Sequence, residues 1–134
     1  MENWLKKLFP EESFVLRPAS SDASFRRYFR ASFPDRTLIV MDAPPPHEDC
    51  RPFVRIAEIF GEAGVHLPEI LSQDIERGFL LLSDLGNTTY LEVLDEKNAD
   101  RLYGDAAESL IKIQLKSRPG ILPEYDDALL MREM

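Results

Sequence analysis

A run of small side chains lies near the N-terminus, between two stretches that are rich in aromatic and β-branched residues. It spans 18–24, and its last five residues are Ser20, Ser21, Asp22, Ala23 and Ser24. Small side chains let backbone N–H groups approach a bound phosphate closely. The run has no glycine, so short hydroxyl side chains would have to take that place. By itself the pattern fits a turn that covers phosphates or an ordinary serine-rich hairpin loop.

Three arginines follow this run, namely Arg26, Arg27 and Arg30. Their forked guanidinium groups suit phosphate oxygens. Strand alternation sends Arg27 to the face opposite Arg26 and Arg30, so one ligand could contact all three only if the strand bends or bulges. The alternative is a solvated or salt-bridged strand face, with acidic partners such as Asp42, Glu58 and Glu62.

A short link follows the apolar run 79–82 and consists of Ser83, Asp84, Leu85 and Gly86. Its residue types by themselves fit a turn that closes a hairpin.

Hydrophobic patterning predicts the elements that would position these residues. A helical stripe over 3–9 ends at Pro10 and predicts a short helix. Aromatic and β-branched residues predict three antiparallel strands, over 14–16, 25–33 and 37–41, with 18–24 as the break between the first two.

A better-marked helix follows the triple proline at 44–46. Phe53, Ile56, Ala57 and Phe60 recur at helical spacing, Asp49 or a neighbour can cap the helix, and Gly64 ends it. Residues 67–71 and 79–82 then predict a second hairpin around a turn at 73–78. The expected element order is therefore β-β-β-α-β-β.

The chain becomes helical after Gly86. A short helix is expected over 88–94 and a longer one over 99–115, for which Asn98 is the candidate N-cap. Asp126 and Asp127 could suggest a metal pair, but they lie where the helix over 126–134 needs a cap. Trp4, Phe25, Tyr28 and Phe29 are expected in the core rather than stacked on a base.

The charge balance excludes several classes of partner. Sixteen basic against twenty-four acidic residues give a net charge of −8, which repels nucleic acid and anionic membranes. Cys50 is the single cysteine, so no internal disulfide can form, as suits a reducing compartment. No charged-then-apolar leader opens the chain, and no apolar run reaches the length of a membrane span. We therefore expect a cytoplasmic protein with no nucleic-acid or membrane partner.

Several stretches resemble a known family of kinases. Residues 21–30, Ser-Asp-Ala-Ser-Phe-Arg-Arg-Tyr-Phe-Arg, resemble the phosphate loop and second strand of bacterial aminoglycoside-phosphotransferase-like kinases. Residues 38–45 resemble the third strand and loop of that family, 53–71 its helix and fourth strand, and 78–86 its fifth strand and hinge. The resemblance implies an α+β fold. Residues 1–83 would form a protein-kinase-like N-lobe, a five-stranded antiparallel sheet with one packed helix, and 84–134 a hinge and the incomplete helical start of a C-lobe.

The same resemblance implies a function. Residues 20–24 would cover the triphosphate of ATP, and 83–86 would bind the edge of the adenine through main-chain atoms, so that Asp84 and Leu85 are candidates by position rather than by side-chain chemistry. Mg²⁺ would be bound by residues of the missing C-lobe. The complete protein would transfer the γ-phosphate to a hydroxyl of a sugar or amino sugar, as in cell-wall recycling. The resemblance also leaves the predicted helices of 84–134 exposed, which could make the chain dimerise.

Two departures from the family pattern put activity in doubt. Such kinases place a lysine on the third strand, but no lysine occurs between Lys7 and Lys97, and the expected position falls near Met41. His66 begins no His-x-Asp sequence, and His47-Glu48-Asp49 has that spacing but directly follows the triple proline, whereas such kinases place the catalytic motif in the C-lobe. Both histidines are therefore expected to be structural or surface residues. We expect the chain to be inactive alone. The alternatives are a free-standing interaction module with this lobe fold and a plain α+β domain without a ligand.

Overall fold

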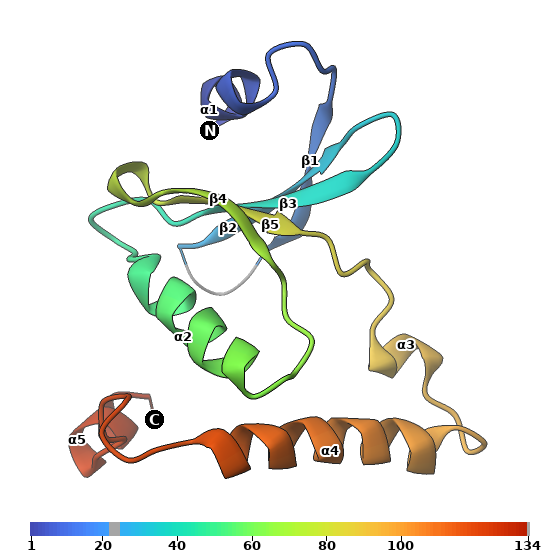
Figure 1. The fold of residues 1–134 in the computed structure, drawn as a ribbon, viewed down its shortest axis with the longest axis vertical. Coiled ribbons are helices and arrows are strands. Elements are labelled where there is room, and N and C mark those ends of the chain that lie inside the picture. The colour runs from blue at the N-terminus through green and yellow to red at the C-terminus, as the bar shows by residue number, and fades with distance from the viewer. Residues whose placement is uncertain (22–24, 134) are drawn as a thin grey trace.

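The computed structural model describes residues 1–21 and 25–133. Their central feature is a five-stranded antiparallel sheet in the order β1-β2-β3-β5-β4 (Figure 1). The strands are β1 (Val15–Ser21), β2 (Arg27–Ser32), β3 (Thr37–Asp42), β4 (Ile70–Asp74) and β5 (Phe79–Ser83). With α2 (Arg51–Glu62) between β3 and β4, the sheet confirms the predicted α+β class and element order.

Strand β1 continues further than its sequence suggests. The expected break at 18–24 is wrong for its first part, because Pro18 pairs with Phe29 and the strand ends only at Ser21. Strand β1 lies at the edge of the sheet. Proline is tolerated in an edge strand because a missing N–H on the side without a neighbouring strand removes no interstrand hydrogen bond. A register shift between Pro18 and Ser20 accommodates one extra residue. The predicted site residues Asp22, Ala23 and Ser24 lie outside the described residues.

The second hairpin joins β4 to β5 through a short 3-10 helix, η1 (Ile75–Arg77). Strand β4 begins at Ile70, so the expected start at Leu67 is wrong. Gly78 follows η1 with a φ of 72°, a backbone conformation that L side chains rarely adopt. Its carbonyl accepts a hydrogen bond of 2.9 Å from the Ala43 N–H, which ties this turn to the end of β3.

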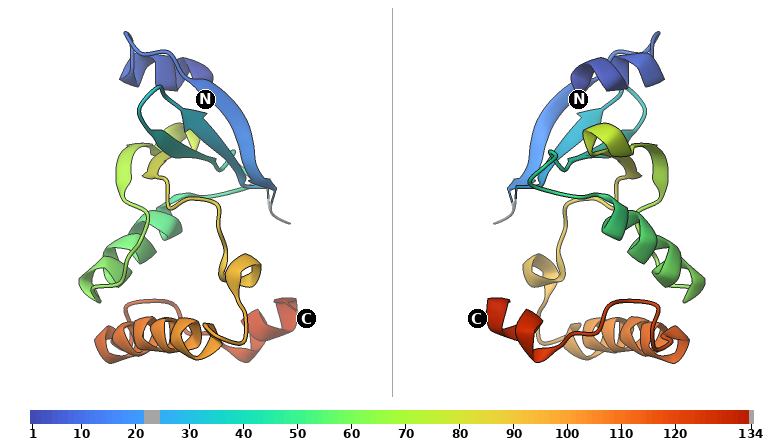
Figure 2. Two further views of the ribbon diagram at one scale, coloured as in Figure 1. Left: turned by 90° about the vertical axis from the view of Figure 1, so that its right-hand side faces the viewer. Right: turned by 90° about the vertical axis from the view of Figure 1, so that its left-hand side faces the viewer.

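The upper face of the sheet is closed by α1 (Glu2–Leu8). Trp4 and Leu5 are buried there against Val40 and Leu81. The ring of Trp4 lies 5.6 Å from that of Phe79, centroid to centroid. Figures 1 and 2 show α1 on the side of the sheet away from the other helices.

A second apolar cluster lies on the opposite face of the sheet, and α2 packs against it. Met41, Leu80 and Leu82 are buried in it, and Phe53 of α2 packs against it. Cys50, just before α2, is also buried there, and burial raises the pKa of its thiol, as expected of a cysteine without a redox role. Ile56, expected on the packed stripe of α2, is exposed.

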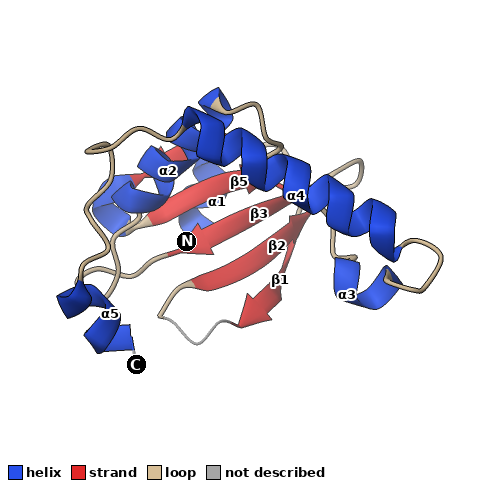
Figure 3. Ribbon diagram, turned by 90° about the horizontal axis from the view of Figure 1, so that it is seen from below, coloured by secondary structure: helices blue, strands red, loops and turns tan. Residues whose placement is uncertain are grey.

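The rest of the chain is helical, with α3 (Tyr90–Val93), α4 (Ala99–Lys116) and α5 (Asp127–Glu133). Seen from below the sheet in Figure 3, α4 lies on the side of the molecule that carries α2. The segment between α4 and α5 reaches α2, because Arg55 donates a 2.7 Å hydrogen bond to the carbonyl oxygen of Ile121. Asp126 caps α5 as predicted, since its carboxylate accepts the Leu129 N–H at 2.8 Å.

The helices α3 to α5 leave much apolar surface uncovered. Leu102 is the buried residue of α4, whereas Leu110 on the predicted apolar stripe is half exposed. The large apolar side chains exposed on these helices are Tyr90, Leu91, Val93, Tyr103, Leu110, Ile111, Leu115, Leu130 and Met131. Within the described part of the chain, no helix combines the length and apolar composition needed to cross a bilayer.

Candidate functional site

The far ends of β1 and β2 flank the predicted phosphate-covering turn. Ser20 is the register partner of Tyr28 and Ser21 that of Arg27, so both serines belong to the ladder by their backbones. The described part of the segment, Ser20 and Ser21, is therefore strand, and it ends beside the start of β2.

The first two arginines are held by carboxylates. Arg26 Nε donates to Glu48 Oε2 at 3.0 Å, and beside this pair the rings of Phe25 and His47 stack with centroids 5.0 Å apart. Phe25 itself is exposed, so its expected place in the core is wrong. Arg27 forms an ion pair with Asp42, its direct cross-strand partner.

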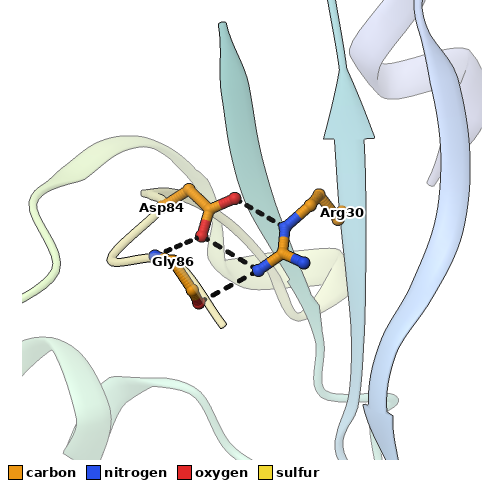
Figure 4. A network of polar contacts seen from close by, with 3 residues as sticks. All are labelled: Arg30, Asp84 and Gly86. Carbon is orange, nitrogen blue, oxygen red and sulfur yellow. Dashed lines mark hydrogen bonds and ion pairs between the residues drawn. The ribbon is translucent and has the colours of Figure 1, made fainter. Parts of the chain in front are cut away.

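The third arginine joins the sheet to the hinge link, 83–86 (Figure 4). Arg30 Nε donates to Asp84 Oδ2 at 2.6 Å, and Arg30 Nη2 donates to Asp84 Oδ1 at 3.1 Å. The same Nη2 also donates to the carbonyl oxygen of Gly86 at 3.0 Å. A further bond of 2.9 Å runs from the Gly86 N–H to Asp84 Oδ1. Of the partners considered from the sequence, Asp42 is confirmed as that of Arg27, whereas Glu58 and Glu62 play no part in these pairs.

The electrostatics of the hinge follow from this contact. The Arg30 guanidinium is the main reason that the pKa of Asp84 lies below its ordinary value. Burial of the carboxylate opposes this effect, and hydrogen bonds from the Thr37 side chain and the Gly86 N–H add to it. The same pair raises the pKa of Arg30. Asp84 is therefore a charged side chain with a specific partner, a role that its sequence position did not reveal.

The main-chain groups of the hinge differ in whether they already form hydrogen bonds. Both groups of Gly86 are bonded within the link, its N–H to Asp84 and its C=O to Arg30. Leu85 lies between Asp84 and Gly86, both of which bind Arg30, and it is half exposed. Within the described residues, neither its N–H nor its C=O has a hydrogen-bond partner. Of these two neighbours, Leu85 is thus the one whose main chain remains available to a ligand.

The third-strand position of the kinase pattern is occupied by an apolar side chain. Met41 is fully buried between its cross-strand partners Tyr28 and Leu80. No cation can act from that position. A cation that the sequence reasoning missed is Arg17, which lies directly across from Arg30 and therefore on the same sheet face. Arg17 is exposed, and it has no carboxylate partner among the residues that the structure describes.

The hinge lies outside the cavity that α2 and β4 enclose. A cavity of about 700 Å³ lies between α2 and β4, and His66, Glu58 and Glu69 are among its lining residues. Hinge residues 83–86 do not line it. In the described ranges 1–21 and 25–133, no group of three or more His, Cys, Asp or Glu residues could hold a metal ion.

Three bacterial kinases are similar to this chain. An N-acetylmuramate/N-acetylglucosamine kinase of Pseudomonas aeruginosa is 55% identical over 100% of this chain and 41% of its own length. The protein of the same name from Pseudomonas putida is 55% identical over 89% of this chain and 35% of its own length. That of Neisseria meningitidis serogroup B is 39% identical over 100% of this chain and 41% of its own length. The chain thus spans about two fifths of the length of the curated relatives it matches.

A family model covers nearly the whole chain. The model of the phosphotransferase enzyme family matches residues 15–133, which include the complete sheet, the hinge and the helices that follow. This match and the similar kinases confirm the resemblance seen in the sequence. With its five-stranded sheet and these matches, the chain belongs to the phosphotransferase enzyme family.

Proposed function

We propose that this chain is the ATP-binding portion of a phosphotransferase that transfers the γ-phosphate of ATP to a hydroxyl of a cell-wall amino sugar. The observation that carries this proposal is the 55% identity, along the entire chain, to a protein named N-acetylmuramate/N-acetylglucosamine kinase. The nucleotide part of the proposal is supported by Leu85, which is half exposed and whose main-chain N–H and C=O have no hydrogen-bond partner among the described residues.

The proposed division of the chain falls at the hinge. Residues 1–83 form the nucleotide-binding lobe, and 84–134 form the hinge and the helical start of the second lobe. The last sheet residue is Ser83, and the segments after it are helical, which supports a boundary at this point. The amino-sugar acceptor would be bound mainly by residues beyond those described.

The proposed contacts to ATP come from both ends of the sheet. Residues 20–24 would cover the triphosphate, and Ser83, Asp84 and Leu85 would offer main-chain groups to the adenine. Arg26, Arg27 and Arg30 already bind carboxylates, so a phosphate role would require each to leave its partner. Arg17 is the better placed source of positive charge, because it lies on the sheet face of Arg30 and is exposed.

Magnesium and catalysis are not supplied by the described residues. The one His-x-Asp of the sequence, His47-Glu48-Asp49, lies in the loop between β3 and α2, where Glu48 binds Arg26 and Asp49 accepts the Arg51 N–H. The described residues offer no cluster of three or more His, Cys, Asp or Glu residues for Mg²⁺. The ligands of Mg²⁺ in such kinases are carboxylate and amide side chains near the transferred phosphate. We therefore propose that the chain binds nucleotide without turning it over.

The second candidate function is that of an interaction module. It is favoured by the exposed apolar side chains of α3 to α5, which a folded chain normally covers. The proposed dimer would use the same surface. It differs from the first candidate because it predicts association of the chain without any need for nucleotide.

Calorimetric titration with Mg-ATP tests the nucleotide proposal. The chain is expected to bind ATP more tightly than tripolyphosphate, because the hinge contributes only to the complex with the base. A variant at a remote exposed position, Leu91→Ala, should bind both as the wild type does. Absence of heat at millimolar ATP would exclude nucleotide binding by this chain. A coupled assay with N-acetylmuramate is expected to show no turnover.

A further inference from the structure

We propose that Arg30 is a positioning residue that holds the hinge in shape, and that it is not a ligand of the nucleotide phosphates. By fixing Asp84 and Gly86, it presents the main chain of Leu85 to the base. This inference rests on the proposed nucleotide role of the hinge. Arginine is a common phosphate ligand. The inference gives Arg30 a different role, which is to support recognition of the base.

The hydrogen bonds form a closed set around Leu85. One guanidinium binds both oxygens of the Asp84 carboxylate and the carbonyl of Gly86. Asp84 Oδ1 in turn accepts the Gly86 N–H. The residues on either side of Leu85 are therefore fixed to β2 and to each other. Leu85 remains the exposed residue between them (Figure 4 shows the surrounding contacts).

Burial makes this clamp stronger than an ordinary surface ion pair. The Asp84 side chain is 5% exposed and that of Arg30 is 26% exposed. A bidentate arginine–carboxylate contact combines charge with fixed geometry. If Arg30 turned toward a phosphate, the buried Asp84 carboxylate would lose its cation, which is costly. The arrangement therefore keeps Arg30 at the hinge.

The neighbouring Arg27 provides a matched control. It also belongs to β2 and also pairs with an aspartate, Asp42, in direct register. Alternation directs it to the opposite sheet face, and its side chain is 61% exposed. Loss of its ion pair leaves the hinge contacts intact. Arg27→Gln thus removes one β2 guanidinium without removing the clamp.

Binding of ATP, adenosine and tripolyphosphate to Arg30→Gln separates the two roles. A positioning role predicts about tenfold weaker binding of ATP and adenosine, equivalent to the loss of one charge-assisted contact, with tripolyphosphate unchanged. Arg30→Lys keeps the charge but not the fork, and should recover only part of the affinity. Arg27→Gln should bind all three ligands as the wild type does.

Two binding results would overturn the inference. One is Arg30→Gln weakening tripolyphosphate as much as ATP, since that would make Arg30 a phosphate ligand. The other is Arg30→Gln binding ATP and adenosine as the wild type does.

Amide hydrogen exchange of 84–87 gives a readout that does not depend on nucleotide. The clamp predicts faster exchange at the Gly86 amide in Arg30→Gln than in Arg27→Gln, and equal rates would refute it. If wild-type protein bound no ATP while this difference persisted, the proposed function would fail and the clamp itself would stand.

Discussion

Asp84 shows how one side chain can matter for a different reason from the one its position suggests. A hinge residue that contacts a base through its main chain can have any side chain, yet this carboxylate is buried and bonded to Arg30 and to the Gly86 N–H. Its charge stabilises the link only while it is ionised. Protonation of Asp84 should therefore weaken the contact between the hinge and β2.

The first prediction concerns pH. Because the pKa of folded Asp84 lies below the ordinary value of 3.8, its contribution to stability is complete above that value and is lost as the pH falls through the lower folded value. Between about pH 5 and about pH 2, wild-type protein should lose about 1 kcal/mol more unfolding free energy than Asp84→Asn. Urea denaturation at several pH values measures the difference. Parallel curves for the two proteins would contradict the assignment.

Gly78 supports a prediction about backbone geometry. Its φ is 72°, and a Cβ placed on it would collide with the carbonyl oxygen of Ala43. Gly78→Ala should therefore destabilise the protein by about 2–4 kcal/mol. Gly104→Ala in α4, where a Cβ meets no atom within 4 Å, should instead stabilise it by about 0.5–1 kcal/mol. Thermal unfolding of both variants measures these changes in stability. Equal changes in the two variants would contradict this account of the turn.

At the scale of elements, the two faces of the sheet have different roles. The α1 side is a closed apolar core around Trp4 and Leu5. The other side carries Tyr28 and Met41 in its core and the clamp of Arg30 at the hinge end. Since α1 covers only the first face, its removal should affect stability without touching the proposed nucleotide contacts.

Docking of α1 can be tested through the single tryptophan. Leu5 is fully buried next to Trp4, so Leu5→Ala should cost about 2–5 kcal/mol. The midpoint of the shift in Trp4 emission should then move to lower urea. Leu91→Ala, at a residue that is 86% exposed, should change stability by no more than about 0.5 kcal/mol. Identical midpoints in the two variants would mean that α1 does not stabilise the sheet.

At the scale of the whole molecule, charge and apolar surface oppose each other. A net charge of −8 favours solubility, whereas the exposed apolar side chains of α3 to α5 favour association. These side chains lie on the helices that follow the hinge. Association should therefore leave the sheet and the hinge clamp unchanged.

Sedimentation experiments test this balance. At tens of micromolar, the chain is expected to form dimers or larger species, and Leu115→Glu combined with Tyr103→Lys should shift it toward monomer. These side chains are 78% and 66% exposed, so their replacement removes surface rather than core. Lys97→Glu changes the charge but no apolar surface, and should leave association in place. A monomeric wild-type protein would exclude this surface as the site of self-association.

The candidate site could be named in part from the sequence. The hinge 83–86 was proposed from the family resemblance, and Arg26, Arg27 and Arg30 from their residue type. Of their partners, Asp42 was among those considered and pairs with Arg27, whereas Glu48 and Asp84 were not considered. Arg17 was missed because its position opposite Arg30 depends on how β1 pairs with β2. Met41, the residue expected near the third-strand lysine position, is apolar and fully buried.

The sequence by itself determined the order and type of the elements, because the periodicity of apolar residues and the positions of Pro and Gly act within a few residues of one another. The tertiary structure alone decided which charges meet. Arg30 and Asp84 are separated by 54 positions along the chain. They come together because β5 inserts between β3 and β4. That strand order and its register are set by packing across the whole sheet, and no local pattern specifies them.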